Sequence, residues 1–131
     1  MKIDHLGIAV RDLRAAAAPW KALAGTEPGP AEEVASQQVR VQFLTIGDLE
    51  VELLEPTAPS AGVAKFLEAR GEGFHHVAIH VESVDRELER LRAAGQRVVD
   101  THARPGARGR RVGFAHPSAF GGVLVEFVEG P

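Results

Sequence analysis

Histidines and glutamates that recur at matching places are the residues of this sequence best suited to chemistry. His5 lies in DHLGIAVRDL, and His76 lies in the similar stretch HHVAIHVESV. Glu52 lies in VELLEP, and Glu126 lies in the similar stretch VEFVEGP. Imidazole and carboxylate side chains together suit zinc, cobalt, nickel, iron or manganese and leave coordination positions for a substrate oxygen. The four residues therefore predict a divalent-metal site.

Strand parity decides which of the adjacent histidines His75 and His76 belongs to this site. Neighbouring side chains on a strand point to opposite faces, so the two cannot serve one site. The bulky residues Val77, Ile79 and Val81 share one face, which should pack on a helix, and His76 shares the other face with Ala78 and His80. We therefore predict that His76 is the partner of His5. His80 is expected to line a substrate cleft, with an exposed histidine of no role as the alternative.

The two glutamates support the same interpretation because each interrupts an apolar strand. Glu52 follows Val51, and Glu126 follows Val125. A carboxylate in such a place is costly to bury unless it is paired or bound to a cation. A single strand histidine or glutamate is more often structural, but here the combination occurs twice.

Repeated elements surround the repeated residues. Helical patterns run from Asp12 to Gly25, where Pro19 predicts a kink, and from Ser83 to Gly95. Asp12 and Ser83 suit the N-cap, and the two glycines suit left-handed C-caps. QQVRVQFLTI and LEVELLE then predict a hairpin with its turn at Gly47-Asp48. In the second copy QRVVDTH, RVGFAH and GVLVEFV are the corresponding strand segments.

The coarse order β-α-β-β-β, written twice, predicts the fold class. The modules cover about 1–57 and 73–131 and are joined by a short helix near 62–70. Neither module can bury its apolar face alone. We predict a single α+β domain in which the two modules form one curved mixed sheet around a cleft, with the helices outside.

Composition narrows the function classes. The chain has 131 residues, a net charge of −3, 44% hydrophobic and 25% charged residues, and no cysteine. These values are ordinary for one globular domain, give no reason to expect nucleic acid as a partner, and exclude disulfides and thiolate metal sites. The beginning, MKIDHLGIAVRDLR, lacks the long apolar run of a signal peptide or membrane span. We expect a cytoplasmic protein that does not bind membranes.

Five stretches of the sequence carry a family resemblance that covers nearly the whole chain. The paired modules with His and Glu in each resemble the vicinal oxygen chelate (glyoxalase/bleomycin resistance/dioxygenase) superfamily. The resemblance is closer to the methylmalonyl-CoA epimerases, and it rests on DHLGIAVRDL, GDLEVELLEP, AKFLEARGEGFHHVAIHV, RPGARGRRVGFAHP and GGVLVEFVE.

The resemblance implies an activity and its cofactor. The family interconverts (2R)- and (2S)-methylmalonyl-CoA by removing and returning the C2 proton through an enolate, which a metal stabilises as a Lewis acid. It implies a divalent metal, often cobalt, with zinc, nickel or manganese as alternatives, at His5, Glu52, His76 and Glu126. Some relatives carry glutamine where this chain has Glu52. An acyl-CoA thioester substrate and a homodimer are also implied.

The resemblance implies only one of the two residues that would carry the C2 proton. Glu126 resembles one of the family's proposed bases while also being a ligand. The position of a second family glutamate falls at about Val41, which cannot transfer a proton. The open candidates for the second acid or base are Glu52, Glu50, Gln42 as an orienting residue only, and a metal-bound water.

An arginine-rich segment offers a site for the coenzyme. RPGARGRR, residues 104–111, has four arginines in eight residues on a net-acidic protein. Arginine forks suit phosphates. We predict that Arg108 and Arg110 bind the phosphates of coenzyme A, with a solvated mobile loop as the alternative.

Other functions remain open for the same cleft. A glyoxalase-I-type lyase would act on a glutathione hemithioacetal through a metal-stabilised enediolate. A metal-free protein that sequesters a small molecule is the alternative from another class, and the four ligand-type residues argue against it. An extradiol dioxygenase fits less well, because those enzymes usually combine two histidines with one carboxylate in longer chains.

Overall fold

The structure is a computed structural model that describes all of residues 1–131. Its strands and helices follow the order β-α-β-β-β twice, so the predicted α+β class is confirmed. None of the helices combines the length and the apolar character that a membrane-spanning helix requires. The elements are β1 (Lys2–Ala9), α1 (Leu13–Ala24), β2 (Glu32–Val34), β3 (Val39–Ile46), β4 (Leu49–Pro56), α2 (Gly62–Arg70), β5 (Gly73–His80), α3 (Val84–Ala93), β6 (Arg104–Pro105), β7 (Arg111–Ala115) and β8 (Leu124–Glu129).

The chain divides into two compact units, and the boundaries between them fall inside strands. The first unit is His5–His75, and the second unit is Met1–Asp4 together with His76–Pro131. The cuts lie in β1 and β5, the two strands that carry the site histidines.

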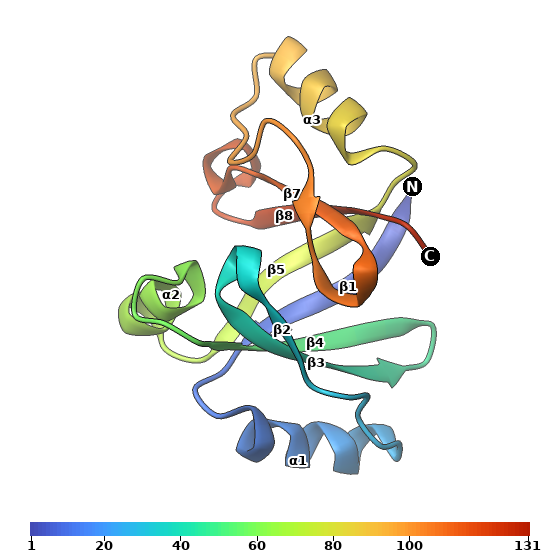
Figure 1. Cartoon of the computed structure of the whole chain (residues 1–131), viewed down its shortest axis with the longest axis vertical. Coiled ribbons are helices and arrows are strands. Elements are labelled where there is room, and N and C mark those ends of the chain that lie inside the picture. Colours follow the sequence, from blue (N-terminus) through green and yellow to red (C-terminus); the bar gives the residue numbers. More distant parts are fainter. The chain divides into compact units, whose positions relative to one another are not determined.

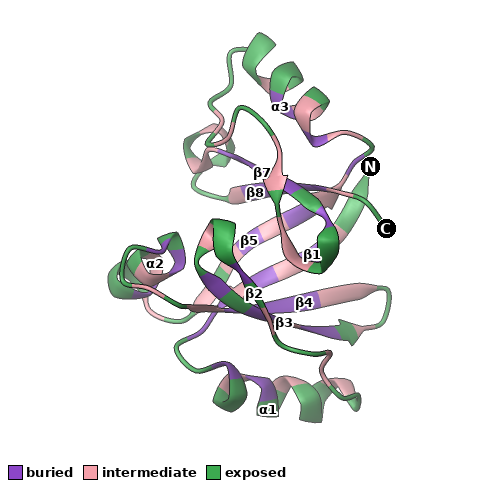
Figure 2. Ribbon diagram, viewed as in Figure 1, coloured by how far each residue is buried: buried purple, intermediate pink, exposed green.

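In the first unit the strands follow the order β2-β3-β4-β1. β1 and β4 are parallel, and the other pairs are antiparallel. Helix α1 lies along one face of this sheet (Figure 1), where Leu13 and Ala17 are buried against the strands. The helix begins as predicted, because the Asp12 carboxylate accepts a hydrogen bond from Ala15 N at 2.9 Å, and it ends at left-handed Gly25. The outward side of α1 is exposed, whereas the middle of β4 is buried (Figure 2).

In the second unit the strands follow the order β5-β8-β7-β6. Helix α3 covers one face and buries Val84 and Leu88 against β7 and β8. Ser83 caps its first turn as predicted, accepting a hydrogen bond from Arg86 N at 3.2 Å. The helix ends one residue earlier than expected, because Ala94 is the C-cap and left-handed Gly95 follows it.

One predicted strand is wrong. QRVVDTH forms a single bridge, between Val98 and Ala115, and the paired strand is β6 further along the chain. The reason is Asp100, whose carboxylate accepts a hydrogen bond from Phe114 N at 2.9 Å and so occupies the place of a ladder bond. The backbone of Val99 and Asp100 donates to the Phe114 carbonyl, which holds the segment on β7 without a regular strand.

Candidate functional site

The first unit buries a histidine beside a glutamate on the sheet face opposite α1. Parallel pairing of β1 and β4 places Gly7 level with Glu52, so His5, two residues earlier, points to the same face. His5 Nε2 lies 3.2 Å from Glu52 Oε1. The two residues are only 3% and 6% exposed, and a strand environment this dry requires that each has a polar partner or a cation.

The second unit repeats this arrangement. Parallel pairing of β5 and β8 places Ala78 level with Glu126. His76 Nε2 lies 3.3 Å from Glu126 Oε1, and the two residues are 0% and 3% exposed. His75, on the other parity, packs its ring against Phe66 of α2, with the centroids 5.0 Å apart. Within its unit, His76 is therefore the histidine that contacts a strand glutamate.

Each pair also has a phenylalanine that the sequence reasoning missed. Phe43 lies opposite Glu52 in the β3–β4 ladder, and Phe114 lies opposite Glu126 in the β7–β8 ladder. Phe43 meets His5 edge to face at 5.5 Å, and Phe114 meets His76 edge to face at 6.0 Å. The repeat could have indicated them, because the two phenylalanines occupy equivalent places in VQFLTI and VGFAHP.

The donor set of the four residues fits a divalent metal. Each residue is buried and offers one ligand atom, either an imidazole nitrogen or a carboxylate oxygen. Two atoms that bind one metal at about 2.1 Å lie roughly 3.0 to 3.4 Å apart. The His–Glu separations of 3.2 Å and 3.3 Å fall in this range. Two buried carboxylates also need positive charge nearby, which a divalent cation supplies.

The surroundings of the first pair bear on the second acid or base. Val41 is 1% exposed and shares the strand face of Phe43, so this position contributes a buried apolar side chain and no acid. Gln42 lies on the opposite face, and its amide donates to the Gly29 carbonyl at 2.8 Å. That bond places Gln42 away from His5. Glu50 shares its strand parity with Glu52, stands level with His5 and is half-buried.

The other predicted site residues lie in the second unit. His80 Nε2 lies 2.8 Å from the Gly130 carbonyl, and the residue lines an open depression with Met1, Lys2, Val81 and Glu82, none of which is a predicted metal ligand. Arg108 is exposed and adopts a left-handed backbone. Arg110 is 7% exposed and donates to Asp4 at 2.6 Å. Arg110 thus has a structural partner, and its contact with a phosphate stays a prediction.

Comparisons with known proteins point to one family. A sequence profile of the Glyoxalase/Bleomycin resistance protein/Dioxygenase superfamily matches residues 4–114. The ethylmalonyl-CoA/methylmalonyl-CoA epimerase of Cereibacter sphaeroides is 38% identical over 95% of both chains. A solved methylmalonyl-CoA epimerase in complex with methylmalonyl-CoA and NH4+ is 38% identical, with a TM-score of 0.92 over 98% of this chain and 94% of the other.

A further solved relative is a variant of Streptomyces coelicolor methylmalonyl-CoA epimerase in complex with 2-nitronate-propionyl-CoA. It has a TM-score of 0.93 at 38% identity, over 99% of this chain and 94% of that one. The chain therefore belongs to the Glyoxalase/Bleomycin resistance protein/Dioxygenase superfamily and, within it, to the methylmalonyl-CoA epimerase family. The predicted membership and the prediction of an enzyme of the epimerase class are confirmed.

Proposed function

We propose that this protein interconverts (2R)- and (2S)-methylmalonyl-CoA with a divalent metal held by His5, Glu52, His76 and Glu126. The observation that carries the proposal is the repeated buried His–Glu pair, at 3.2 Å in one unit and 3.3 Å in the other. The solved relative that binds methylmalonyl-CoA supports the choice of substrate. The proposal requires that the two modules act as one domain, so that both pairs reach one ion.

The metal and the residues have separate tasks. Cobalt is the metal we expect, with zinc, nickel and manganese as alternatives. When bound, it would act as a Lewis acid toward the charge that develops on the thioester oxygen. Phe43 and Phe114 hold the imidazole rings edge-on and exclude water from them. Low local polarity strengthens the electrostatic interactions inside such a site.

Proton transfer at C2 is the task of the carboxylates. We assign Glu126 to remove the C2 proton: the C–H bond breaks, the proton moves to the carboxylate, and the electron pair delocalises into the thioester as an enolate. Glu52 is the proposed carrier that returns a proton on the opposite face, because Val41 holds no acid. Glu50, which has the same strand parity as Glu52, is the alternative carrier.

The test follows the C2 proton directly. Protein stripped with chelator and reloaded with cobalt is incubated with methylmalonyl-CoA in D₂O, and NMR follows loss of the C2 proton and interconversion of the epimers. We expect exchange and epimerisation with metal and neither without it. Absence of exchange in both samples would refute the reaction. Turnover of methylglyoxal with glutathione by the same sample would assign the glyoxalase-I-type lyase instead.

Three further features belong to the proposal. We assign Arg108, and Arg110 beside it, to the phosphates of coenzyme A, and His80 to the wall of the substrate cleft. Neutralising Arg108 and Arg110 together should raise the KM for the thioester, although loss of the Asp4 contact requires a parallel unfolding measurement. We also propose a homodimer, as the family resemblance implies, and light scattering during size-exclusion chromatography tests it.

A further inference from the structure

Arg104 lies on the sheet face of the second unit that is opposite α3. It lies on β6 level with Val112 of β7, so its side chain projects on the same face as Val112 and Phe114. The guanidinium carbon stands 5.4 Å from the centroid of the Phe114 ring. This is the geometry of a cation–π contact, which holds a cation at the boundary between an apolar surface and a ligand.

Asp100 fixes the orientation of this guanidinium. Its Oδ1 lies 3.3 Å from Arg104 Nε, while its Oδ2 accepts the bond from Phe114 N at 2.9 Å. One carboxylate thus ties the arginine to the strand that carries the ring beneath it. The Arg104 side chain remains 31% exposed, although its Nε is buried. Part of the side chain is therefore accessible from the solvent.

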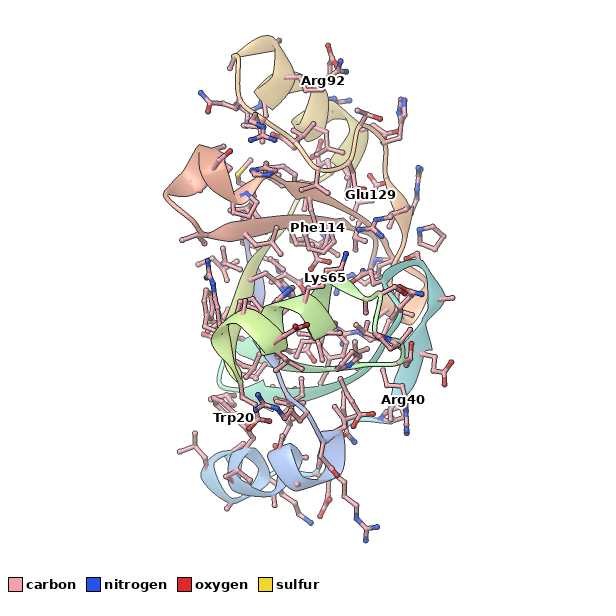
Figure 3. The ribbon with its side chains drawn as sticks, turned by 90° about the vertical axis from the view of Figure 1, so that its left-hand side faces the viewer. Trp20, Arg40, Lys65, Arg92, Phe114 and Glu129 are labelled. Carbon is pink, nitrogen blue, oxygen red and sulfur yellow. The ribbon has the colours of Figure 1, made fainter.

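Arg104 stands close to the second His–Glu pair. Phe114, the ring beneath it, meets His76 edge to face and lies level with Glu126 across the ladder (Figure 3 labels Phe114). The neighbouring arginines face elsewhere: Arg110 is bound to Asp4, and Arg111 lies near Glu129 on the side of α3. Of Arg104, Arg110 and Arg111, Arg104 is therefore the one that lies over the ring that contacts His76.

We propose that Arg104 recognises the free carboxylate of the acyl group and makes the enzyme selective for carboxylated acyl thioesters. This inference rests on the proposed function, since it concerns the same substrate. A guanidinium offers two parallel N–H donors to a carboxylate, and partial desolvation over the Phe114 ring strengthens the bond. A thioester without the carboxylate would leave the guanidinium without that bond, which is a strong basis for rejection.

The experiment compares two thioesters that differ only in the carboxylate. For Arg104→Gln we expect the KM for methylmalonyl-CoA to rise about 10- to 100-fold, the loss typical of a hydrogen bond between charged groups. The inhibition constant of propionyl-CoA, which lacks the carboxylate, should stay within about twofold. The KM of Arg104→Lys for methylmalonyl-CoA should lie between the values of the wild type and Arg104→Gln, because lysine keeps the charge but loses the paired N–H donors of the guanidinium.

Arg92→Gln is the matched control. Arg92 lies on α3 (Figure 3), where it is exposed and pairs with Glu89, and its loss should change neither constant. Equal weakening of both thioesters in Arg104→Gln and Arg104→Lys would overturn the proposal and assign the arginine to the coenzyme or to folding. Unchanged values for both thioesters would overturn it as well.

Calorimetry separates this inference from the proposed reaction. The affinities of methylmalonyl-CoA and propionyl-CoA are measured directly on the wild-type protein and the Arg104 variants. If the wild-type protein binds methylmalonyl-CoA more tightly and Arg104→Gln abolishes that preference, Arg104 has the proposed role even where no epimerisation is seen. If the wild-type protein epimerises methylmalonyl-CoA but the preference survives in Arg104→Gln, only the role of Arg104 fails.

Discussion

The two units of this protein share one framework but differ beside the phenylalanine. In both, a strand histidine, a glutamate and a phenylalanine meet on one sheet face. In the first unit, Gly29 N donates to the Phe43 carbonyl, and glycine has no side chain that could hold another residue over the ring. In the second, Asp100 takes this place against Phe114 and holds Arg104 over the ring. The ligand-type residues are thus repeated, and in the second unit Arg104 stands over the phenylalanine.

In the proposed enzyme, this difference would separate two tasks, which are holding the metal and orienting the substrate. Holding a metal needs equivalent ligands, and the repeat supplies them in both units. Orienting an asymmetric substrate needs a feature that is present once, because a symmetric site would bind it in two orientations. The following predictions test the equivalence and the asymmetry, beginning with the largest effect.

Removing either histidine should abolish most metal binding. We expect His5→Ala and His76→Ala each to lower metal content and kcat more than about 100-fold, because each removes one ligand of the same ion. Metal analysis after dialysis and the D₂O assay measure these effects. His102→Ala, at an exposed loop position, is the control. A variant at His5 or His76 that keeps both metal and activity would break the ligand assignment.

The two glutamates should be less equivalent than the histidines. Glu126→Gln should lower kcat by about 10²- to 10⁴-fold, because it removes a proton carrier. Glu52→Gln should retain metal, since some epimerases carry glutamine there, and should lose the return of the proton on the second face. NMR can measure C2 exchange separately from epimerisation. Equal epimerisation by Glu52→Gln and the wild type would transfer the role to another acid, with Glu50→Gln as the next variant.

The phenylalanines should show the asymmetry between the units. Phe43→Leu and Phe114→Leu should each cost about 1 kcal/mol of unfolding free energy, because both rings are buried. Only Phe114→Leu should also raise the KM for methylmalonyl-CoA several-fold, because it removes the ring beneath Arg104. Urea unfolding and steady-state kinetics check the two parts. Equal KM changes in both variants would contradict the asymmetry.

The smallest effects concern the carboxylates that cap the helices. Glu55 accepts a hydrogen bond from Leu13 N at 2.8 Å, and Glu129 accepts one from Val84 N at 3.1 Å. Alanine at either position should cost about 1 kcal/mol of unfolding free energy, the usual loss for a helix N-terminal cap. Thermal unfolding at two salt concentrations measures it. If only one variant is destabilised, the caps are not equivalent.

Much of the fold and of the candidate site was predictable because both follow local rules. Alternation along β5 separated His76 from His75, and the repeat indicated the glutamate that His5 and His76 each contact within their units. Helix starts at Asp12 and Ser83 followed from side chains that cap their own first turn. These features depend on residues close in sequence, so the sequence alone determined them.

Other features depended on contacts between distant residues, and only the tertiary structure decided them. The pairing of Phe43 and Phe114 with the histidines follows from the register of antiparallel strands. Asp100 replaced a predicted strand by bonding to β7, and the same carboxylate orients Arg104. Arg110 is buried and donates to Asp4, a residue near the other end of the chain. Such choices depend on which polar groups remain to be satisfied once the sheet has formed, and no local pattern records that.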